Sequence, residues 1–132
     1  HLIDVVQDAS VWGLFRHPIA ARWYGEGIAL VGDAAHPMLP FLAQGANMAL
    51  EDAWVLGVSL KNDKIETYQR LRAPRVAKVL KTTQGNAQRY HLRRGPVRLA
   101  AHTGLKILST FAPKLMLKQF DWLYRHDVTQ QK

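Results

Sequence analysis

The chain has 132 residues, of which 48% are hydrophobic, so it is long enough to bury the core of one domain. It contains no cysteine, which excludes disulfide bonds and thiolate metal sites. The net charge of +8 is uneven, because residues 1–63 carry three Lys/Arg and seven Asp/Glu whereas residues 64–132 carry fifteen and three. We interpret the basic half as helix faces whose acidic counterpart lies elsewhere; a nucleic-acid or membrane-binding tail is the alternative.

The first residues resemble neither a protein start nor a secretory signal. The chain opens with His1 rather than Met, and Asp4 and Asp8 interrupt the only apolar stretch near it. The longest uncharged run, residues 34–50, contains two prolines and a histidine and therefore does not predict a membrane span. We expect a piece of a longer, cytoplasmic protein.

Two short apolar runs predict strands in the first third of the chain. Residues 10–15 are rich in strand-forming side chains and end at Arg16-His17-Pro18, which predicts an edge or connecting strand. After a predicted loop over residues 18–27, the continuous apolar run 28–31 predicts a strand buried on both faces. Open α/β sheets bind ligands beyond the carboxyl ends of their strands, so we look for chemistry directly after residue 31.

A loop and a helix follow this second run. Two prolines and a Gln-Gly step predict an extended loop over residues 34–44. Apolar residues at helical spacing predict a helix over residues 46–60, and Glu51 and Asp52 fit near the positive end of its dipole.

The basic half is predicted to be helical throughout. A helix begins near Ile65 and ends between Gly85 and Leu92, and Pro74 is expected to kink or divide it. After the break at residues 94–96, two shorter helices are predicted, over residues 97–109 and 113–124.

The stretch that joins the second apolar run to the following helix is the most informative. Gly32 would let a ligand approach the backbone closely, and Asp33 supplies a carboxylate that accepts hydrogen bonds from sugar-like hydroxyls. Gly45, Ala46 and Asn47 lie at a predicted helix N-terminus, whose unpaired N–H groups favour a developing negative charge. The pattern indicates a bound group that has both a polyol chain and an edge that becomes negative.

These residues, within GIALVGDAAHPMLPFLAQGANMALEDAWVLG, resemble the single-component FAD-dependent aromatic hydroxylases, especially the salicylate hydroxylase-like group. Looser likeness continues through residues 68–75 to residues 121–124. The resemblance implies an α/β fold, namely the C-terminal part of a Rossmann-like FAD-binding monooxygenase, mostly helical here with a few short strands. It divides the chain into the end of the substrate-domain sheet (1–24), an FAD-binding strand-loop-helix (25–62) and a basic helical C-terminal region (63–132).

The resemblance also implies roles for individual residues. Asp33 would bind the ribityl hydroxyls of FAD, and the backbone of the helix start would contact the pyrimidine side of the isoalloxazine. Pro40 is the residue expected nearest to the reacting atoms, beside the flavin face, where its ring helps to exclude water. The cofactor-binding set comprises Gly32, Asp33, Ala34, Gln44, Gly45, Ala46 and Asn47.

The implied reaction is hydroxylation of a phenolic or benzoate-type ring. NAD(P)H reduces FAD, O2 gives a flavin C4a-hydroperoxide, and its distal oxygen attacks the aromatic ring. The expected partners are a small aromatic substrate, O2 and an upstream part of the polypeptide that carries the GxGxxG motif for the ADP half of FAD; a homodimer is a further option. The chain alone is expected to bind FAD weakly and to be inactive. The same scaffold could act on a quinone precursor, a purine or a polyketide ring.

Two functions of other classes remain as alternatives. A non-catalytic interaction module could have kept the shape of the flavin site without its chemistry. A basic polyanion-binding domain is disfavoured because residues 70–98 show no recognisable nucleic-acid module. A metal site is not expected, since Asp33 and His36 lack a third ligand and Pro37 and Pro40 break any helix there.

The remaining histidines and aromatics are interpreted structurally. His36 is expected to be a satisfied structural histidine or to lie near the FAD pyrophosphate. His17, His91, His102 and His126 are expected on the surface. Met48 and Trp54 are expected to pack their helix against the sheet, and the cluster at residues 122–124 to anchor the tail to the body.

Overall fold

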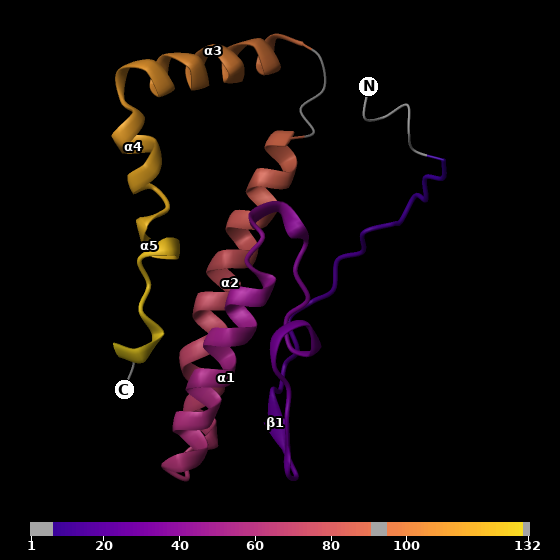
Figure 1. Ribbon diagram of the computed structural model, residues 1–132, viewed down its shortest axis with the longest axis vertical. Helices are drawn as coiled ribbons and strands as arrows, with labels where there is room; N and C mark the ends of the chain where they lie inside the picture. Colours follow the sequence, from indigo (N-terminus) through magenta and orange to yellow (C-terminus); the bar gives the residue numbers. More distant parts are fainter. Residues whose placement is uncertain (1–6, 91–94, 131–132) are drawn as a thin grey trace.

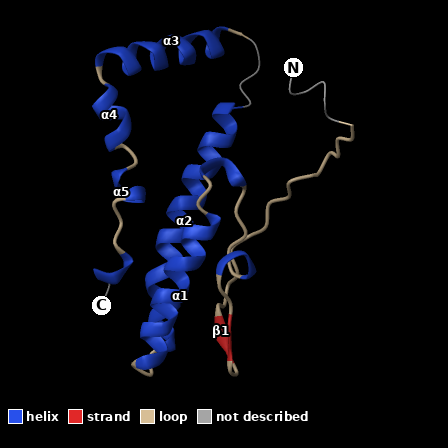
Figure 2. Ribbon diagram, in the orientation of Figure 1, coloured by secondary structure: helices blue, strands red, loops and turns tan. Residues whose placement is uncertain are grey.

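The computed structural model describes residues 7–90 and 95–130, and these are mostly helical (Figures 1 and 2). The α-helices are α1 (Gly45–Lys61), α2 (Ile65–Tyr90), α3 (Pro96–Phe111), α4 (Pro113–Lys118) and α5 (Asp121–Tyr124). Short 3₁₀ turns are η2 (Gly32–Ala34), η3 (Pro40–Leu42) and η4 (Val128–Gln130), and the strands are β1 (Tyr24–Gly25) and β2 (Ile28–Ala29).

Helices α1 and α2 run antiparallel and in contact through the middle of the molecule (Figure 1). The turn between them ends α1 at Lys61 and places Asp63 in the left-handed region, with φ of 54°. Apolar side chains on the facing sides of the two helices form the core together with residues from the preceding loop and from α5. The buried apolar residues are Trp23, Ala35, Met48, Val55, Tyr68, Val76, Val79 and Leu123.

A small hairpin and a buried tryptophan fix the segment that precedes α1. Strands β1 and β2 pair antiparallel around Glu26-Gly27, both with positive φ, as a two-residue hairpin turn requires. The backbone N–H of Trp23 donates to Gln69 Oε1 at 3.0 Å, and the Tyr68 hydroxyl donates to the Leu30 carbonyl at 2.8 Å. These bonds from α2 set the point from which the chain enters η2.

The predicted strands differ from the observed ones. Residues 10–15 have no regular structure, and Val11 and Trp12 are 101% and 84% exposed, so the predicted strand there is wrong. The loop predicted over residues 18–27 contains β1. The run 28–31 forms a strand over only two residues, and Ile28 is 65% exposed, so burial on both faces is also wrong. Among the described residues this strand has a single neighbour, and a sheet face is buried only where further strands or helices cover it.

The helix predictions are closer to the structure. The predicted helix 46–60 is confirmed as α1, extended by one residue at each end. α2 begins at Ile65 as predicted, but it is one helix across Pro74, so a division there is wrong. Pro74 is exposed, and buried residues on both sides hold the helix in place despite the lost hydrogen bond. Its end at Tyr90 lies within the predicted limits, whereas Leu92 is outside the described residues.

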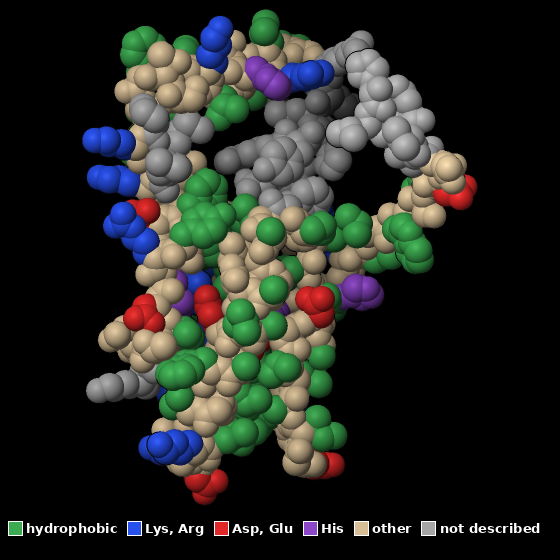
Figure 3. Space-filling model, in the orientation of Figure 1, with side chains coloured by type: hydrophobic (Ala, Val, Ile, Leu, Met, Phe, Trp, Pro, Cys, Tyr) green, Lys and Arg blue, Asp and Glu red, His purple; other side chains and the backbone are tan. Residues whose placement is uncertain are grey.

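The last predicted helices are also modified. The helix predicted over residues 97–109 is confirmed as α3, whereas that over residues 113–124 is two helices, α4 and α5, separated at residues 119–120. α3 contacts α4 and leaves large apolar side chains exposed, namely Leu99, Leu105, Ile107, Leu108 and Phe111. Exposed Lys and Arg side chains gather over α3 to α5 in the space-filling view (Figure 3). Within the described ranges, no helix combines the length and the hydropathy that a membrane crossing needs.

Candidate functional site

The Gly-Asp turn lies directly against the first half of α1. Gly32 has φ of +56°, a conformation that favours glycine, and a Cβ on it would lie 3.0 Å from the Ala49 Cβ. Gly32 is buried. The sequence predicted that a ligand approaches the Gly32 backbone closely, but it is helix α1 that does so, and this packing holds the turn against the helix.

The turn presents an exposed carboxylate beside the start of α1. Asp33 is exposed, and a Cβ on Gly45 would lie 3.9 Å from Asp33 Oδ1. The side chain of the N-cap residue Gln44 accepts no backbone N–H of the first helical turn, and its Oε1 instead accepts the side-chain Nδ2 of Asn47 at 3.2 Å. The N–H groups of the first helical turn therefore lack a capping side chain and can donate to a ligand. The structure brings Asp33 together with the helix start.

The remaining predicted residues lie on the loop that joins these two parts. Ala34 ends η2 and is exposed, as is Ala46 in the first turn of α1. Pro40 begins η3 and is exposed, and its turn ends at Ala43 in the left-handed conformation, with φ of 49°. Gln44 is only 6% exposed, so its side chain packs within the loop and leaves little surface for a ligand to contact.

A cluster of buried charges lies behind this turn, and the sequence did not predict it. Asp52 is fully buried, and its Oδ2 accepts the Gly32 N–H at 3.0 Å and lies 2.5 Å from His36 Nε2. The other oxygen, Oδ1, accepts Arg72 Nε at 2.8 Å. Because a carboxylate only accepts, Nε2 is the nitrogen of His36 that carries the hydrogen in this bond.

The cluster continues to the C-terminal tail. Arg72 Nη1 donates to Glu51 Oε2 at 2.5 Å, and Arg75 donates to both oxygens of Glu51, at 2.6 and 2.7 Å. Arg75 also donates to the carbonyls of Trp122 and Leu123, at 3.2 and 3.3 Å. With Leu123 buried in the core, these bonds confirm that residues 122–124 anchor the tail.

Both carboxylates are held in the charged form. Burial alone raises the pKa of Asp52, but hydrogen bonds from His36, Arg72 and the Gly32 N–H outweigh it and bring the pKa below its ordinary value of 3.8. Burial likewise raises the pKa of Glu51, and the two arginines more than offset it. These ion pairs give an acidic counterpart to only two of the basic residues of the second half, Arg72 and Arg75. They replace the helix-dipole explanation, since neither carboxylate lies in the first turn of α1.

A signal for this cluster was present in the sequence. Arg72 lies four residues after Tyr68 and four before Val76, on the buried stripe of α2, and Asp52 lies four residues after Met48 on that of α1. Charged residues in apolar stripes of two neighbouring helices indicate a buried ion pair.

Several structural interpretations need correction. His36 is 1% exposed, but its Nδ1 is buried without a hydrogen-bond partner among the described residues, so it is only half satisfied. His126 is partly buried, with its Nε2 3.8 Å from Glu51 Oε2, whereas His17 and His102 are exposed as predicted; His91 lies outside the described residues. Met48 is buried as predicted, but Trp54 is 49% exposed. In the described ranges, no group of three or more potential ligands could hold a metal ion.

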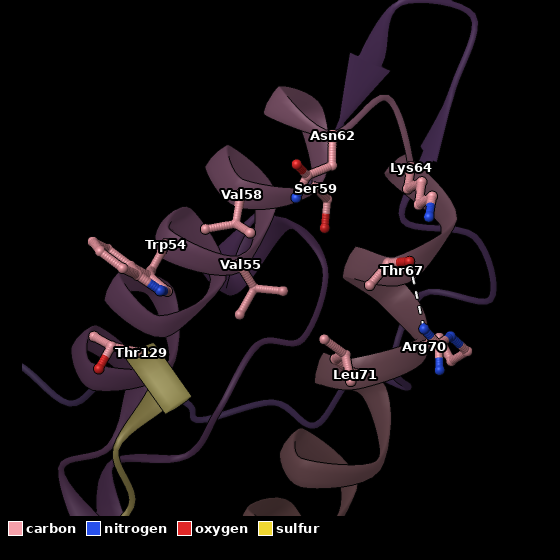
Figure 4. A pocket seen from close by; sticks show the side chains of 10 residues that line it. All are labelled: Trp54, Val55, Val58, Ser59, Asn62, Lys64, Thr67, Arg70, Leu71 and Thr129. Atoms are coloured by element: carbon pink, nitrogen blue, oxygen red, sulfur yellow. Dashed lines mark hydrogen bonds between the residues drawn. The ribbon is translucent and has the colours of Figure 1, made fainter. Parts of the chain in front are cut away.

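One sizeable cavity in the described part of the chain is separate from the Gly-Asp turn. It encloses about 580 Å³ between the C-terminal half of α1, the start of α2 and η4 (Figure 4). Val55, Val58 and Leu71 line its apolar side, and Thr67 and Arg70 lie at one edge, joined by a 3.5 Å hydrogen bond. None of the predicted cofactor residues lines it, whereas Gln44 and Asn47 line a smaller groove of about 370 Å³ on the tail side of α1.

The uncapped start of α1 can donate N–H groups to a negatively charged part of a ligand, and the exposed Asp33 carboxylate can accept hydrogen bonds from its hydroxyls. Residues 3–83 match the family described as the FAD binding domain, and the chain belongs to that family. Its relatives include 3-amino-4-hydroxybenzoate 2-monooxygenase PtmB3 of Streptomyces platensis, 40% identical over 72% of this chain and 26% of the relative. Salicylate hydroxylase of Pseudomonas putida is 32% identical over 96% of this chain and 29% of the relative. 3-Hydroxybenzoate 6-hydroxylase of Polaromonas naphthalenivorans is 32% identical over 96% of this chain and 32% of the relative.

The chain thus spans about a quarter to a third of the length of these relatives. The residues present fit part of an FAD site. A carboxylate that can accept from hydroxyls stands beside N–H donors that no side chain caps, and a Cβ at position 45 would only come into ordinary van der Waals contact, at 3.9 Å, with Asp33 Oδ1.

Proposed function

We propose that the complete protein is an FAD-dependent monooxygenase that hydroxylates a phenolic or benzoate-type ring with NAD(P)H and O2. The observation that carries this proposal is the exposed Asp33 carboxylate beside the uncapped start of α1 at Gly45. Family membership and the aromatic monooxygenases among the relatives support it. When bound, FAD supplies the redox chemistry that activates O2.

Each part of the turn and helix start has a role in this proposal. Asp33 accepts hydrogen bonds from the ribityl hydroxyls, and its charge orients them. The N–H groups of Gly45, Ala46 and Asn47 donate to the edge of the ring that gains negative charge on reduction, and they are fixed in place by α1 before the charge develops. Pro40 excludes water beside the reacting face, without transferring a proton.

We further propose that the chain is the C-terminal part of a Rossmann-like fold. Residues 1–24 would end the substrate-domain sheet, 25–62 would form the FAD strand-loop-helix, and 63–132 the basic helical region. The part of the relatives that this chain does not span would supply the GxGxxG motif and most of the aromatic pocket. The chain spans only 26% and 29% of two of its relatives, which supports its being one part of a longer polypeptide.

The test is the visible absorption spectrum of the purified full-length protein before and after NADH or NADPH is added. We expect a flavin spectrum that bleaches, and that bleaches faster when a phenolic or benzoate-type acid is present. A colourless protein that cannot be reconstituted with FAD would instead favour a non-catalytic interaction module.

A matched pair of variants tests the site itself. Asp33→Ala should lower the flavin content, because the ribityl hydroxyls lose their charged acceptor. Glu66→Ala removes an exposed carboxylate from the first turn of α2 and should leave the flavin content unchanged. Equal flavin content in both variants would remove Asp33 from its assigned role.

A further inference from the structure

The buried charge cluster behind the Gly-Asp turn has no role in the proposed reaction, yet it contacts the turn directly. The Asp52 carboxylate accepts the backbone N–H of Gly32, the residue before Asp33, at 3.0 Å. This is a side chain from the second turn of α1 bonded to the loop that precedes α1, twenty residues earlier in the sequence. Asp52 therefore connects the two parts of the proposed flavin site.

The cluster is built so that this oxygen has little freedom to move. Asp52 Oδ2 also meets His36 Nε2, which comes from the end of the same turn, while Oδ1 is held by Arg72 of α2. Arg72 is in turn fixed by Glu51 and by the Met48 carbonyl, and all of its side chain is buried. A buried charge with all of these partners is held in one geometry, because any displacement leaves a desolvated donor or acceptor unpaired.

The backbone hydrogen bonds of Gly32 itself divide into those that close the turn and the one that joins it to α1. Gly32 has a conformation that favours glycine, and η2 is a single turn closed by the bonds of Ala35 and His36 to the Gly32 carbonyl, both at 2.9 Å. These bonds close the turn internally, whereas the bond from Gly32 to Asp52 sets the position of the turn relative to α1.

We propose that Asp52 is a positioning residue for the flavin, which acts by fixing the Gly32–Asp33 turn against the start of α1. The proposal rests on the proposed function, because it takes Asp33 and the N–H groups of α1 as the groups that hold FAD. Asp52 does not touch the cofactor. It sets the separation of the two groups that do.

The test compares Asp52→Asn with Glu51→Gln in the full-length protein. Both variants remove one carboxylate charge from the same arginine cluster, but among the described residues the Glu51 carboxylate is hydrogen-bonded to Arg72 and Arg75 and not to the turn. We expect Asp52→Asn to weaken FAD binding by about tenfold, because the amide cannot accept from all three donors that Asp52 serves, and Glu51→Gln to weaken it by less than about threefold. The dissociation constant is measured by FAD fluorescence quenching on titration into apoprotein.

A spectroscopic readout separates positioning from a general loss of stability. At saturating FAD, the visible circular dichroism of the bound flavin should change in Asp52→Asn and remain that of the wild type in Glu51→Gln. If Asp52→Asn does not fold, Asp52→Glu keeps the charge while moving the carboxylate, and the same tenfold loss is expected. Equal dissociation constants and spectra for the Asp52 and Glu51 variants would overturn the proposal.

A double variant distinguishes failure of this proposal from failure of the proposed function. If Asp52 acts through the turn, adding Asp52→Asn to Asp33→Ala should change the dissociation constant by less than about twofold. A full tenfold further loss would mean that Asp52 acts by another route. If Asp33→Ala alone leaves FAD affinity unchanged, it is the proposed flavin site that fails.

Discussion

Replacement of Arg72 by methionine should destabilise the α1–α2 pair more than any exposed substitution. Arg72 is fully buried, and it donates to Asp52 at 2.8 Å, to Glu51 at 2.5 Å and to the Met48 carbonyl at 3.3 Å. Methionine keeps most of the volume of the side chain but leaves two carboxylates without this partner. Removal of one member of a buried ion pair costs about 3–5 kcal/mol, because the remaining charge stays desolvated.

Hydrogen exchange of the α1 and α2 amides in the full-length protein measures this loss locally. We expect the most protected amides of these helices to exchange about a hundredfold faster or more. The control is Arg125→Met, whose ion pair with Asp121 spans 3.5 Å between side chains that are 79% and 41% exposed. Such pairs contribute about 0–1 kcal/mol. Protection that falls equally in the two variants would refute the argument that burial makes the Arg72 cluster decisive.

Three further predictions follow from the same packing. Asp52 has a lowered pKa in the fold, so it stabilises the protein above its unfolded value near 3.8 and that contribution is lost as pH falls; Asp52→Asn should flatten the acid limb of a stability-against-pH curve. Gly32→Ala should cost about 1–3 kcal/mol in a urea titration, since φ is +56° and the new methyl would lie 3.0 Å from the Ala49 Cβ. Leu123→Ala should cost about 2–4 kcal/mol and expose the tail to limited proteolysis, because Leu123 is 4% exposed in the core.

Two of these predictions have a matched comparison variant. Gly57→Ala, in the middle of α1 with nothing within 4 Å of the new Cβ, should stabilise the protein by up to about 1 kcal/mol. Leu105→Ala, at a side chain that is 55% exposed, should leave the tail as resistant to protease as in the wild type. An acid limb that is unchanged in Asp52→Asn, or a Gly32→Ala variant as stable as Gly57→Ala, would contradict the respective prediction.

The sequence by itself determined the parts that depend on neighbouring residues. Helical spacing of apolar residues placed α1 to within one residue at each end, because that periodicity is a local property. The Gly-Asp step and the glycine at the helix start predicted a carboxylate beside free N–H groups, and the structure brings Asp33 and Gly45 together. The strand expected at residues 10–15 is wrong because strand formation, unlike helical periodicity, is not a local property. A strand depends on a neighbour with which to pair, and a short apolar run does not show whether one exists.

Only the tertiary structure decided how the two halves of the chain are joined. The sequence predicted that Glu51 and Asp52 are acids near a helix start and that Arg72 and Arg75 belong to a basic surface. In the structure the turn at residues 62–64 places α2 back along α1, and these four residues form ion pairs. Those partners lie 20 to 24 residues apart in the sequence, so no local pattern shows which residue pairs with which. The bond from Asp52 to Gly32 is of the same kind. Whether a charge in a helix is solvated or buried depends on which surface packs against it, and folding of the whole chain determines that surface.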